Sequence, residues 1–216
     1  MADIKLYSYW RSSAAYRVRI ALNLKKLNYD TVPVHLVKNG GEQHGVEFAA
    51  LNASELVPVL VDGDISLNQS LAIIEYLDEQ YPEVKLIPAE TRQKYLVKAL
   101  AQDIAADIHP INNLRVLQYL SGVLEVNDQQ KGDWYRHWIN IGFQALEKKL
   151  ASTAGVYSVG DSISLVDICL VPQVYNAERF NLDMSAFPII SRVTKELRKH
   201  PAFEEAAPER APDANS

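Results

Sequence analysis

The sequence predicts an α/β domain followed by an all-α domain, and three observations lead to that prediction. Short apolar runs typical of strands alternate with helical periodicity between residues 4 and 81. A proline-bearing stretch from Tyr81-Pro82 to Pro88 then interrupts the pattern. Beyond it, apolar residues recur at helical spacing and no convincing strand follows. We therefore expect one domain at 1–82 and a second at 89–216.

The first half is expected to fold in the order βαβα and then ββα, which makes a small mixed sheet with helices on its faces. A strand at 4–9 leads through a turn into a helix that ends near Leu27. One broad apolar arc of this helix contains Val18, Ile20, Ala21, Leu22, Leu24 and Leu27, with Arg19, Asn23 and Lys26 opposite.

An extended run at 30–37 follows, in which Pro33 favours an edge position or an irregular strand. A short helix is expected at 46–51, and strands at 57–61 and 65–67 are joined by an Asp-Gly turn. Asn68 is expected to cap a helix at 69–81.

The second half is expected to contain four helices, at 91–120, 128–150, 164–180 and 188–200. The first bends at His109-Pro110, where a backbone N–H is missing. The second carries Trp134, Trp138, Ile141 and Ala145 on its apolar side. The third begins with Ser164-x-x-Asp167, which is a capping box. The polar, proline-bearing end, APERAPDANS, is expected to be mobile.

Composition narrows the possible functions. The chain of 216 residues has 22 basic and 27 acidic residues and a net charge of −5, which argues against nucleic-acid binding. No apolar run approaches the length of a membrane span, and the start MADIKLY has no signal-peptide core. The single cysteine, Cys169, lies in an apolar run, permits no internal disulfide and suits a reducing compartment. We expect a cytoplasmic protein.

Ser12 and Ser13 stand where the first strand turns into the first helix. The first turn of a helix offers unpaired N–H groups and the positive end of the helix dipole. With Arg11 before the hydroxyls and Arg17 after them, the turn suits an anion, of which a thiolate is one candidate. Arg17 lies inside the apolar arc, where a charge is costly unless it is paired. The structural alternative is that a serine simply caps the helix.

Three further stretches point to a ligand. A cis Val57-Pro58 bond would leave the Val57 N–H and C=O to pair with an extended peptide; the alternative is an ordinary turn proline. Asn68-Gln69-Ser70 opens a helix and could receive a carboxylate, or could be only a cap. Gln43, in a glycine-bearing loop, could add an amide contact.

An α/β domain with an anion pocket, an open backbone edge and a carboxylate cradle, fused to helices, resembles the glutathione transferase superfamily with its thioredoxin-like N-terminal domain. The serine motif of the zeta class is similar to YWRSSAAYRVRIAL. Further zeta-class blocks resemble LVPVL, NQSLAIIEYL, HPINNLRVL and YSVGDSISLVDICLVPQVYNAERF. The resemblance covers nearly the whole chain. The family includes maleylacetoacetate isomerase and maleylpyruvate isomerase, both of which use glutathione.

The resemblance implies roles for individual residues. Ser12 and Ser13 would support the glutathione thiolate, with Arg11 beside them in the catalytic group. The implied glutathione contacts are Ser12, Ser13, Arg17, Gln43, Val57, Pro58, Gln69, Ser70, His109 and Asn113. The implied substrate contacts are Arg11, His109, Arg115 and Arg179. A surface ion pair of Arg179 with Glu178 or Asp183 is the alternative to its functional role. No metal is expected.

The implied reaction is the glutathione-dependent isomerisation of maleylacetoacetate to fumarylacetoacetate, or of maleylpyruvate to fumarylpyruvate, in the catabolism of tyrosine and other aromatic compounds. His109 in HPINN matches the maleylpyruvate pattern better. One alternative is a general glutathione transferase or dehalogenase of the same fold, and another is a non-catalytic interaction module. The family cysteine after the serine pair is Ala14 here, which puts in doubt only chemistry that depends on that thiol.

The partners that the resemblance implies are a small dicarboxylate enone as substrate and a second copy of the chain in a homodimer. Neither a nucleic acid nor a membrane is expected as a partner.

Overall fold

The computed structural model describes residues 4–214, which divide into two compact units. The first unit contains the chain up to Leu86 together with the segment from Lys199 onward, and the second runs from Ile87 to Arg198. The division differs from the sequence prediction at the C-terminus. The segment after Lys199 was expected within the helical domain at 89–216 and instead belongs to the α/β unit.

The first unit is built on a four-stranded mixed sheet with the strand order β2-β1-β3-β4. The strands are β1 (Ile4–Ser8), β2 (Tyr29–Pro33), β3 (Val59–Asp62) and β4 (Ile65–Asn68). Strand β1 runs parallel to β2 and antiparallel to β3, and β3 and β4 form a hairpin. Pro33 ends the edge strand β2, as predicted from its missing N–H.

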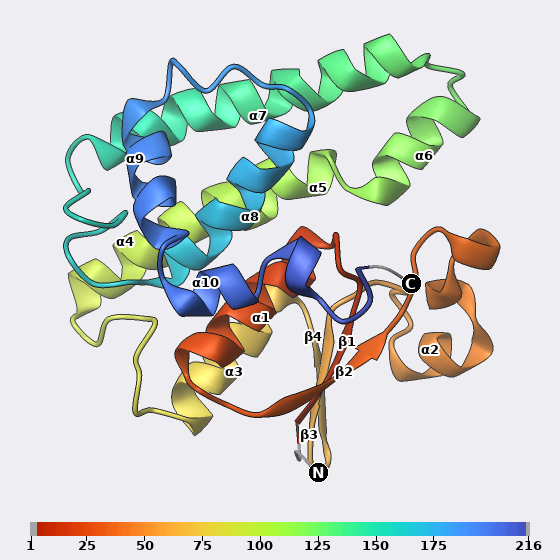
Figure 1. Cartoon of the computed structure of the whole chain (residues 1–216), viewed down its shortest axis with the longest axis horizontal. Helices are drawn as coiled ribbons and strands as arrows, with labels where there is room; N and C mark the ends of the chain where they lie inside the picture. Colours follow the sequence, from red (N-terminus) through yellow and green to blue (C-terminus); the bar gives the residue numbers. More distant parts are fainter. Residues whose placement is uncertain (1–3, 215–216) are drawn as a thin grey trace. The chain divides into compact units, whose positions relative to one another are not determined.

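Helices cover both faces of this sheet, as the predicted element order requires. Helices α1 (Ser13–Leu24) and α3 (Ser70–Gln80) pack against each other on one face (Figure 1). Helix α2 (Val46–Leu51) lies on the other face, where the Phe48 ring is 6.1 Å from the ring of Tyr7. Short 3-10 turns, η1 (Lys38–Gly40) and η2 (Glu42–His44), precede α2.

Two predictions in this unit need correction. Asn68 does not cap α3 but ends β4, and its side chain donates to Asn52 Oδ1 at 2.9 Å. The residue at the N-cap position is Gln69, with a φ of 68°. Arg19 was expected on the polar side of α1 but is only 2% exposed, because the C-terminal segment packs on that side.

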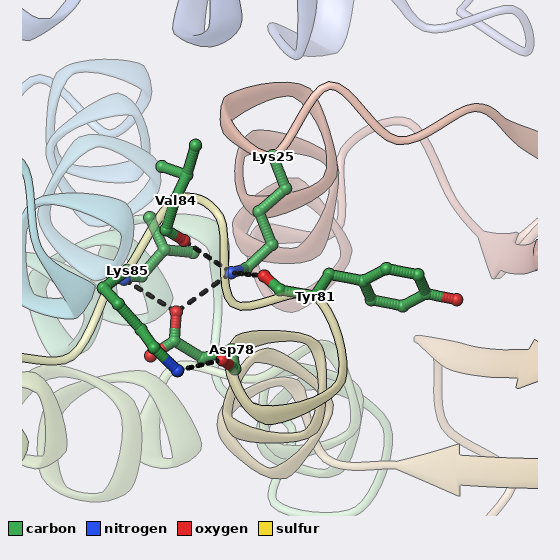
Figure 2. Close-up of polar contacts among 6 residues, drawn as sticks. Lys25, Asp78, Tyr81, Val84 and Lys85 are labelled. Carbon is green, nitrogen blue, oxygen red and sulfur yellow. Dashed lines mark hydrogen bonds and ion pairs between the residues drawn. The ribbon is translucent and has the colours of Figure 1, made fainter.

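A buried ion pair fixes the chain where it leaves α3 (Figure 2). Lys25 Nζ, just after α1, donates to Asp78 Oδ1 at 3.0 Å and to the carbonyls of Tyr81 and Val84 at 2.9 and 2.6 Å. The same carboxylate oxygen accepts the Leu86 N–H at 2.7 Å. Buried charges are tolerated when they are paired and hydrogen-bonded in this way.

The second unit is helical, as predicted. Its elements are α4 (Thr91–Gln102), a π-helical segment η3 (Asp103–Ile108), α5 (His109–Ile111), α6 (Leu114–Gly122), α7 (Asp128–Leu150), α8 (Leu165–Arg179) and α9 (Pro188–Leu197). The helix predicted at 91–120 is therefore not one bent helix. It widens before Pro110 and is interrupted after it, because Asn112 leaves the helical conformation and the Asn113 side chain caps α6.

The π-helical segment packs closely on α7. Ile108, at the end of this segment, is 2% exposed. A Cβ added to Gly142 of α7 would overlap the Ile108 side chain. Glycine at this position therefore permits the close approach of the two elements.

The predicted apolar side of α7 was wrong in part. Ile141 is 46% exposed and Ala145 is exposed, and Trp134 and Trp138 are only half-buried. The buried positions of α7 are Gly132, Tyr135, Ile139, Phe143, Leu146 and Leu150. Two faces of α7 carry apolar residues, so the periodicity did not distinguish the face that packs.

The predicted capping box at the start of α8 is confirmed. Asp167 Oδ2 accepts the Ser164 N–H at 2.8 Å and its hydroxyl at 3.0 Å, while Oδ1 accepts the Ser158 N–H at 2.9 Å. Burial raises the pKa of Asp167, and these hydrogen bonds act in the opposite direction. Cys169 is fully buried in the same helix, as expected of a core residue.

The C-terminal segment is packed rather than mobile, which corrects the sequence prediction as far as Ala214; Asn215 and Ser216 lie outside the described residues. Helix α10 (Pro201–Glu205) packs on α1, and a 3-10 turn, η4 (Pro208–Arg210), follows. Asn23 donates to the Ala202 carbonyl at 3.1 Å. Asp213 is only 3% exposed.

Candidate active site

The serine turn lies between β1 and α1. The Ser12 N–H donates to the Tyr9 carbonyl at 2.9 Å, and Ser12 Oγ accepts the Ala15 N–H at 3.2 Å, so Ser12 caps the helix. A serine hydroxyl has two lone pairs and one O–H. The cap uses one lone pair and leaves the O–H to donate to an anion at the positive end of α1. Ser12 is half-buried and Ser13 is buried.

Arg11 is exposed but held in place by aromatic neighbours. Its guanidinium lies 4.6 Å from the centre of the Trp10 ring and donates to the Tyr9 hydroxyl at 3.1 Å. Stacking on a ring restrains the side chain while leaving its charge available. Trp10 was not among the residues predicted for the site, although a tryptophan directly before an arginine in the serine turn was a usable signal.

Arg17 and Ser70 meet at the start of α3. Arg17 is 2% exposed, and its Nη1 donates to Ser70 Oγ at 3.2 Å. The backbone before Ser70 has a positive φ at Gln69, a conformation that costs energy for a side-chain-bearing residue. A buried cation beside a helix N-terminus concentrates positive charge, and a carboxylate there would be stabilised by both.

Gln43 lies in the loop before α2 with its side chain buried. Its Nε2 is 3.0 Å from His44 Nε2, and within residues 4–214 its Oε1 has no hydrogen-bond partner. A Cβ added to Gly41 would come within 2.5 Å of Gln43 Nε2, so the loop closes tightly on the carboxamide. His44 Nδ1 in turn bonds the Glu55 carboxylate, a contact that the sequence reasoning missed because the two residues lie on separate loops.

The Val57-Pro58 peptide bond is cis, as predicted, and β3 begins directly after the proline. The Val57 side chain packs in an apolar cluster with Tyr9, Phe48 and Val59. The backbone N–H and C=O of Val57 make no hydrogen bond to any other residue between 4 and 214.

In the helical unit, His109 and Asn113 lie close in sequence but on different elements. His109 is half-buried at the start of α5, and Asn113 Oδ1 accepts the Arg115 N–H at 3.2 Å as the cap of α6. Arg115 itself is exposed in the first turn of α6.

Arg179 ends α8, and its guanidinium lies 4.9 Å from the centre of the Phe180 ring. The Phe180 ring stacks on Tyr135 with centres 3.6 Å apart. Burial raises the pKa of Tyr135, while the charge of Arg179 and its hydrogen bond to the phenol oppose that rise. Tyr135 was not among the residues predicted for the site, because no sequence signal links it to a residue on another helix.

The expected alternative for Arg179, an ion pair with a nearby carboxylate, is wrong. Glu178 pairs instead with Arg198 at 2.7 and 3.0 Å. Asp183 accepts the Ser185 N–H at 2.9 Å. Among the described residues, Arg179 therefore presents a cation without a carboxylate partner.

Neither a metal cluster nor a membrane span is seen in the described part of the chain. Between residues 4 and 214, no group of three or more His, Cys, Asp or Glu side chains could hold a metal ion. No helix in the same range combines the length and apolarity that crossing a membrane needs.

Comparison with known proteins identifies the family. Residues 2–79 match the model of the glutathione S-transferase N-terminal domain, and residues 139–201 match that of the C-terminal domain. The chain is 64% identical over 214 residues to a probable maleylacetoacetate isomerase from Vibrio cholerae, covering 99% of this chain and 100% of the relative.

Solved structures agree with this relationship. A holo maleylpyruvate isomerase, described as a bacterial zeta-class glutathione S-transferase, has a TM-score of 0.94 and 44% identity, covering 97% of this chain and 99% of the other. A maleylacetoacetate isomerase from Methylobacterium extorquens, with bound malonate and glutathione, has a TM-score of 0.93 and 37% identity, covering 98% and 100%. The chain therefore belongs to the glutathione S-transferase family and, within it, to the zeta class.

Proposed function

We propose that the chain is a glutathione-dependent cis–trans isomerase that converts maleylacetoacetate or maleylpyruvate to the fumaryl isomer. The observation that carries the proposal is the 64% identity, over 99% of the chain, to a protein named probable maleylacetoacetate isomerase. When bound, glutathione supplies a thiolate that adds reversibly to the cis double bond, which allows rotation before the sulfur leaves. Glutathione is regenerated in each cycle and acts as a cofactor.

Ser12 is the residue proposed to keep the sulfur ionised, with Ser13 and Arg11 beside it. A free thiol is only a few per cent ionised at neutral pH, and lowering its pKa by two units needs about 2.7 kcal/mol. A hydroxyl hydrogen bond to an anion supplies roughly 1.5–3 kcal/mol, and a helix N-terminus about 0.3–1 kcal/mol. The cap geometry of Ser12 supports this role, because its O–H remains available to donate. No separate base is needed.

The rest of the tripeptide would be held by other parts of the first unit. Arg17, Ser70 and Gln69 form a positive cradle suited to the γ-glutamyl carboxylate. The Val57 backbone, fixed by Pro58, offers an N–H and a C=O to the cysteinyl unit. The buried Oε1 of Gln43 is suited to accept an N–H of the tripeptide. His109 and Asn113 belong to the helical unit, and their proposed roles as glutathione contacts are those that the family resemblance implies.

Cations are proposed to bind the substrate, which carries two carboxylates. Arg179 supports this role best, because an aromatic ring and a phenol hold it and no carboxylate between residues 4 and 214 pairs with it. Arg11, Arg115 and His109 are the other candidates. Guanidinium groups bind carboxylates in two-point geometry and stabilise the charge that develops on the keto acid during the reaction.

One assay tests the proposed function. Each substrate is mixed with the enzyme, with and without glutathione, while the fumaryl product and the total free thiol are both followed. We expect turnover only with glutathione and a constant amount of free thiol. Consumption of thiol in step with substrate would instead indicate a general transferase or dehalogenase. No turnover and no glutathione binding would indicate an interaction module.

Three further properties belong to the same proposal. We infer that the helical domain binds the substrate and that two copies of the chain form a homodimer, as the zeta-class relationship suggests; sedimentation velocity tests the dimer. A cytoplasmic location is supported by the lone cysteine, Cys169, which permits no disulfide within the chain.

A further inference from the structure

The C-terminal segment reaches the serine turn through a buried carboxylate. Asp213 Oδ2 accepts the Trp10 N–H at 2.9 Å, and Asp213 is only 3% exposed. Trp10 lies between Tyr9, whose carbonyl bonds the Ser12 N–H, and Arg11, which stacks on the Trp10 ring. A residue near the end of the chain therefore holds the peptide that precedes Arg11 and Ser12.

Arg19 binds the carbonyl group of Trp10, on the opposite side of that residue from the N–H that Asp213 binds. Its Nη2 donates to the Trp10 carbonyl at 3.0 Å, its Nε to the Ala206 carbonyl at 3.0 Å and its Nη1 to Ser8 Oγ at 3.2 Å. Burial lowers the pKa of Arg19, and the negative charge of Asp213 is among the influences that raise it. The N–H and the C=O of Trp10 are thus both bound, one by Asp213 and one by Arg19.

These contacts go beyond what packing of the segment requires. Helix α10 is already attached to α1 through Asn23 and Tyr16, which bond the carbonyls of Ala202 and Phe203. Asp213 lies further along the chain, past η4, and its carboxylate bonds the backbone of the turn between β1 and α1. Hydrogen bonds to charged groups are stronger than those between neutral groups, so this one restrains the turn effectively.

We propose that Asp213 and Arg19 are positioning residues that hold the turn from Tyr9 to Ser12 in the conformation needed for catalysis. This inference rests on the proposed function, in which Ser12 and Arg11 act on the thiolate and the substrate. Small displacements of catalytic groups are costly to the rate. The C-terminal segment is accordingly part of the working active site.

The decisive variant is Asp213→Ala in the full-length chain, with Asp213→Asn as its conservative partner. We expect Asp213→Ala to lower kcat about tenfold, because one charge-assisted hydrogen bond to the turn is lost. The pKa of the bound glutathione thiol, read from thiolate absorbance against pH, should rise, while KM for glutathione changes little. The kcat and thiol pKa of Asp213→Asn should lie between those of the wild type and Asp213→Ala, because the amide oxygen of asparagine can still accept the Trp10 N–H.

Hydrogen exchange separates positioning from general stability. In Asp213→Ala we expect faster exchange at the amides of Trp10, Arg11 and Ser12 and unchanged exchange in β3 and α3. Asp161→Ala is the matched control, because its carboxylate also accepts a backbone N–H, that of Val156 at 2.8 Å, in a loop outside the proposed site. It should match the wild type in all three measurements.

The outcomes are distinguishable. A wild-type protein without glutathione-dependent turnover would reject the proposed function itself. The positioning role would be overturned if the wild type is active and Asp213→Ala has the same kcat, thiol pKa and hydrogen exchange as Asp161→Ala. Faster exchange throughout the first unit would also overturn it, because the carboxylate would then be only structural. If Asp213→Ala is unfolded at the assay temperature, Asp213→Asn decides by the same three measurements.

Discussion

The two units present their candidate functional side chains in different ways. In the first unit, Ser12 caps a helix, Arg17 is buried against Ser70, and Gln43 is enclosed by its own loop. In the helical unit, Arg115 and Arg179 are exposed at helix ends. The first arrangement encloses its polar groups, as suits the tight binding proposed for glutathione. The second exposes positive charge to solvent, as suits the small dicarboxylate proposed as the substrate.

The largest effect on activity is expected at Ser12. Ser12→Ala should lower kcat by about 100- to 1000-fold at saturating glutathione, as does loss of one donor from an oxyanion site. Ser12→Gly should lower it equally but cost less stability, because glycine is a tolerated N-cap. Steady-state kinetics and thermal unfolding of both variants separate the two roles of the hydroxyl. Normal turnover in either variant would remove Ser12 from the mechanism.

Substitution of Lys25 tests whether the stability of the first unit can be lowered without weakening glutathione binding. Lys25→Met leaves the Asp78 carboxylate buried without its cation and should lower the free energy of unfolding by about 3 kcal/mol. Urea titration measures this loss. The Kd for glutathione should stay unchanged, since neither residue belongs to the proposed site. Lys26→Met, at an exposed neighbouring lysine, is the control, and an equal loss of stability in both would show that the buried pair is unimportant.

Substitution of Arg17 tests the buried arrangement of the first unit. Arg17→Met keeps an apolar stem in the core but removes the cation beside Ser70, and should weaken glutathione binding about 30-fold. Calorimetric titration gives the Kd, and kcat at saturating glutathione should largely recover. Ser70→Ala retains the cation and should weaken binding less. A larger effect of Ser70→Ala would indicate that the hydroxyl, rather than the charge, holds the carboxylate.

Substitution of Arg179 tests the exposed cations of the helical unit and is expected to show the smallest effect. Arg179→Gln should raise KM for the maleyl substrate about tenfold, the loss of one charged contact, and leave KM for glutathione unchanged. Arg198→Gln is matched in chemistry, but Arg198 is already paired with Glu178, so its substrate KM should not move. Equal behaviour of the two variants would place substrate binding elsewhere, with Arg115 as the next candidate.

The sequence was sufficient where local rules and structure agree. Strand β1, the serine-capped helix, the Asp-Gly hairpin and the capping box at Ser164 each depend on residues within a few positions of one another. The predicted site residues of the first unit lie at the ends of these elements, so their places in the fold follow from local rules. Their roles in binding and catalysis stay predictions.

Prediction failed where distant segments decide. Arg19 looked solvent-facing because its covering segment lies near the other end of the chain. On α7, two apolar stripes compete, and only contacts with other helices show which one is buried. The partners of Arg179 were also missed for this reason. Tyr135 comes from another helix, and the nearest carboxylate in the sequence, Glu178, is already paired with Arg198.

The π-helical segment before His109 has a consequence for the family's evolution. Such a segment holds one more residue than an α-helix does over the same hydrogen-bonded turn. Deleting one residue between Asp103 and Ile108 would restore α-helical winding and leave His109 pointing in nearly the same direction, because the wider π turn already absorbs the extra residue. What would change is the bulge that brings Ile108 against Gly142 of α7. We expect a homologue that lost the extra residue to keep the direction of its histidine and to need no glycine at position 142.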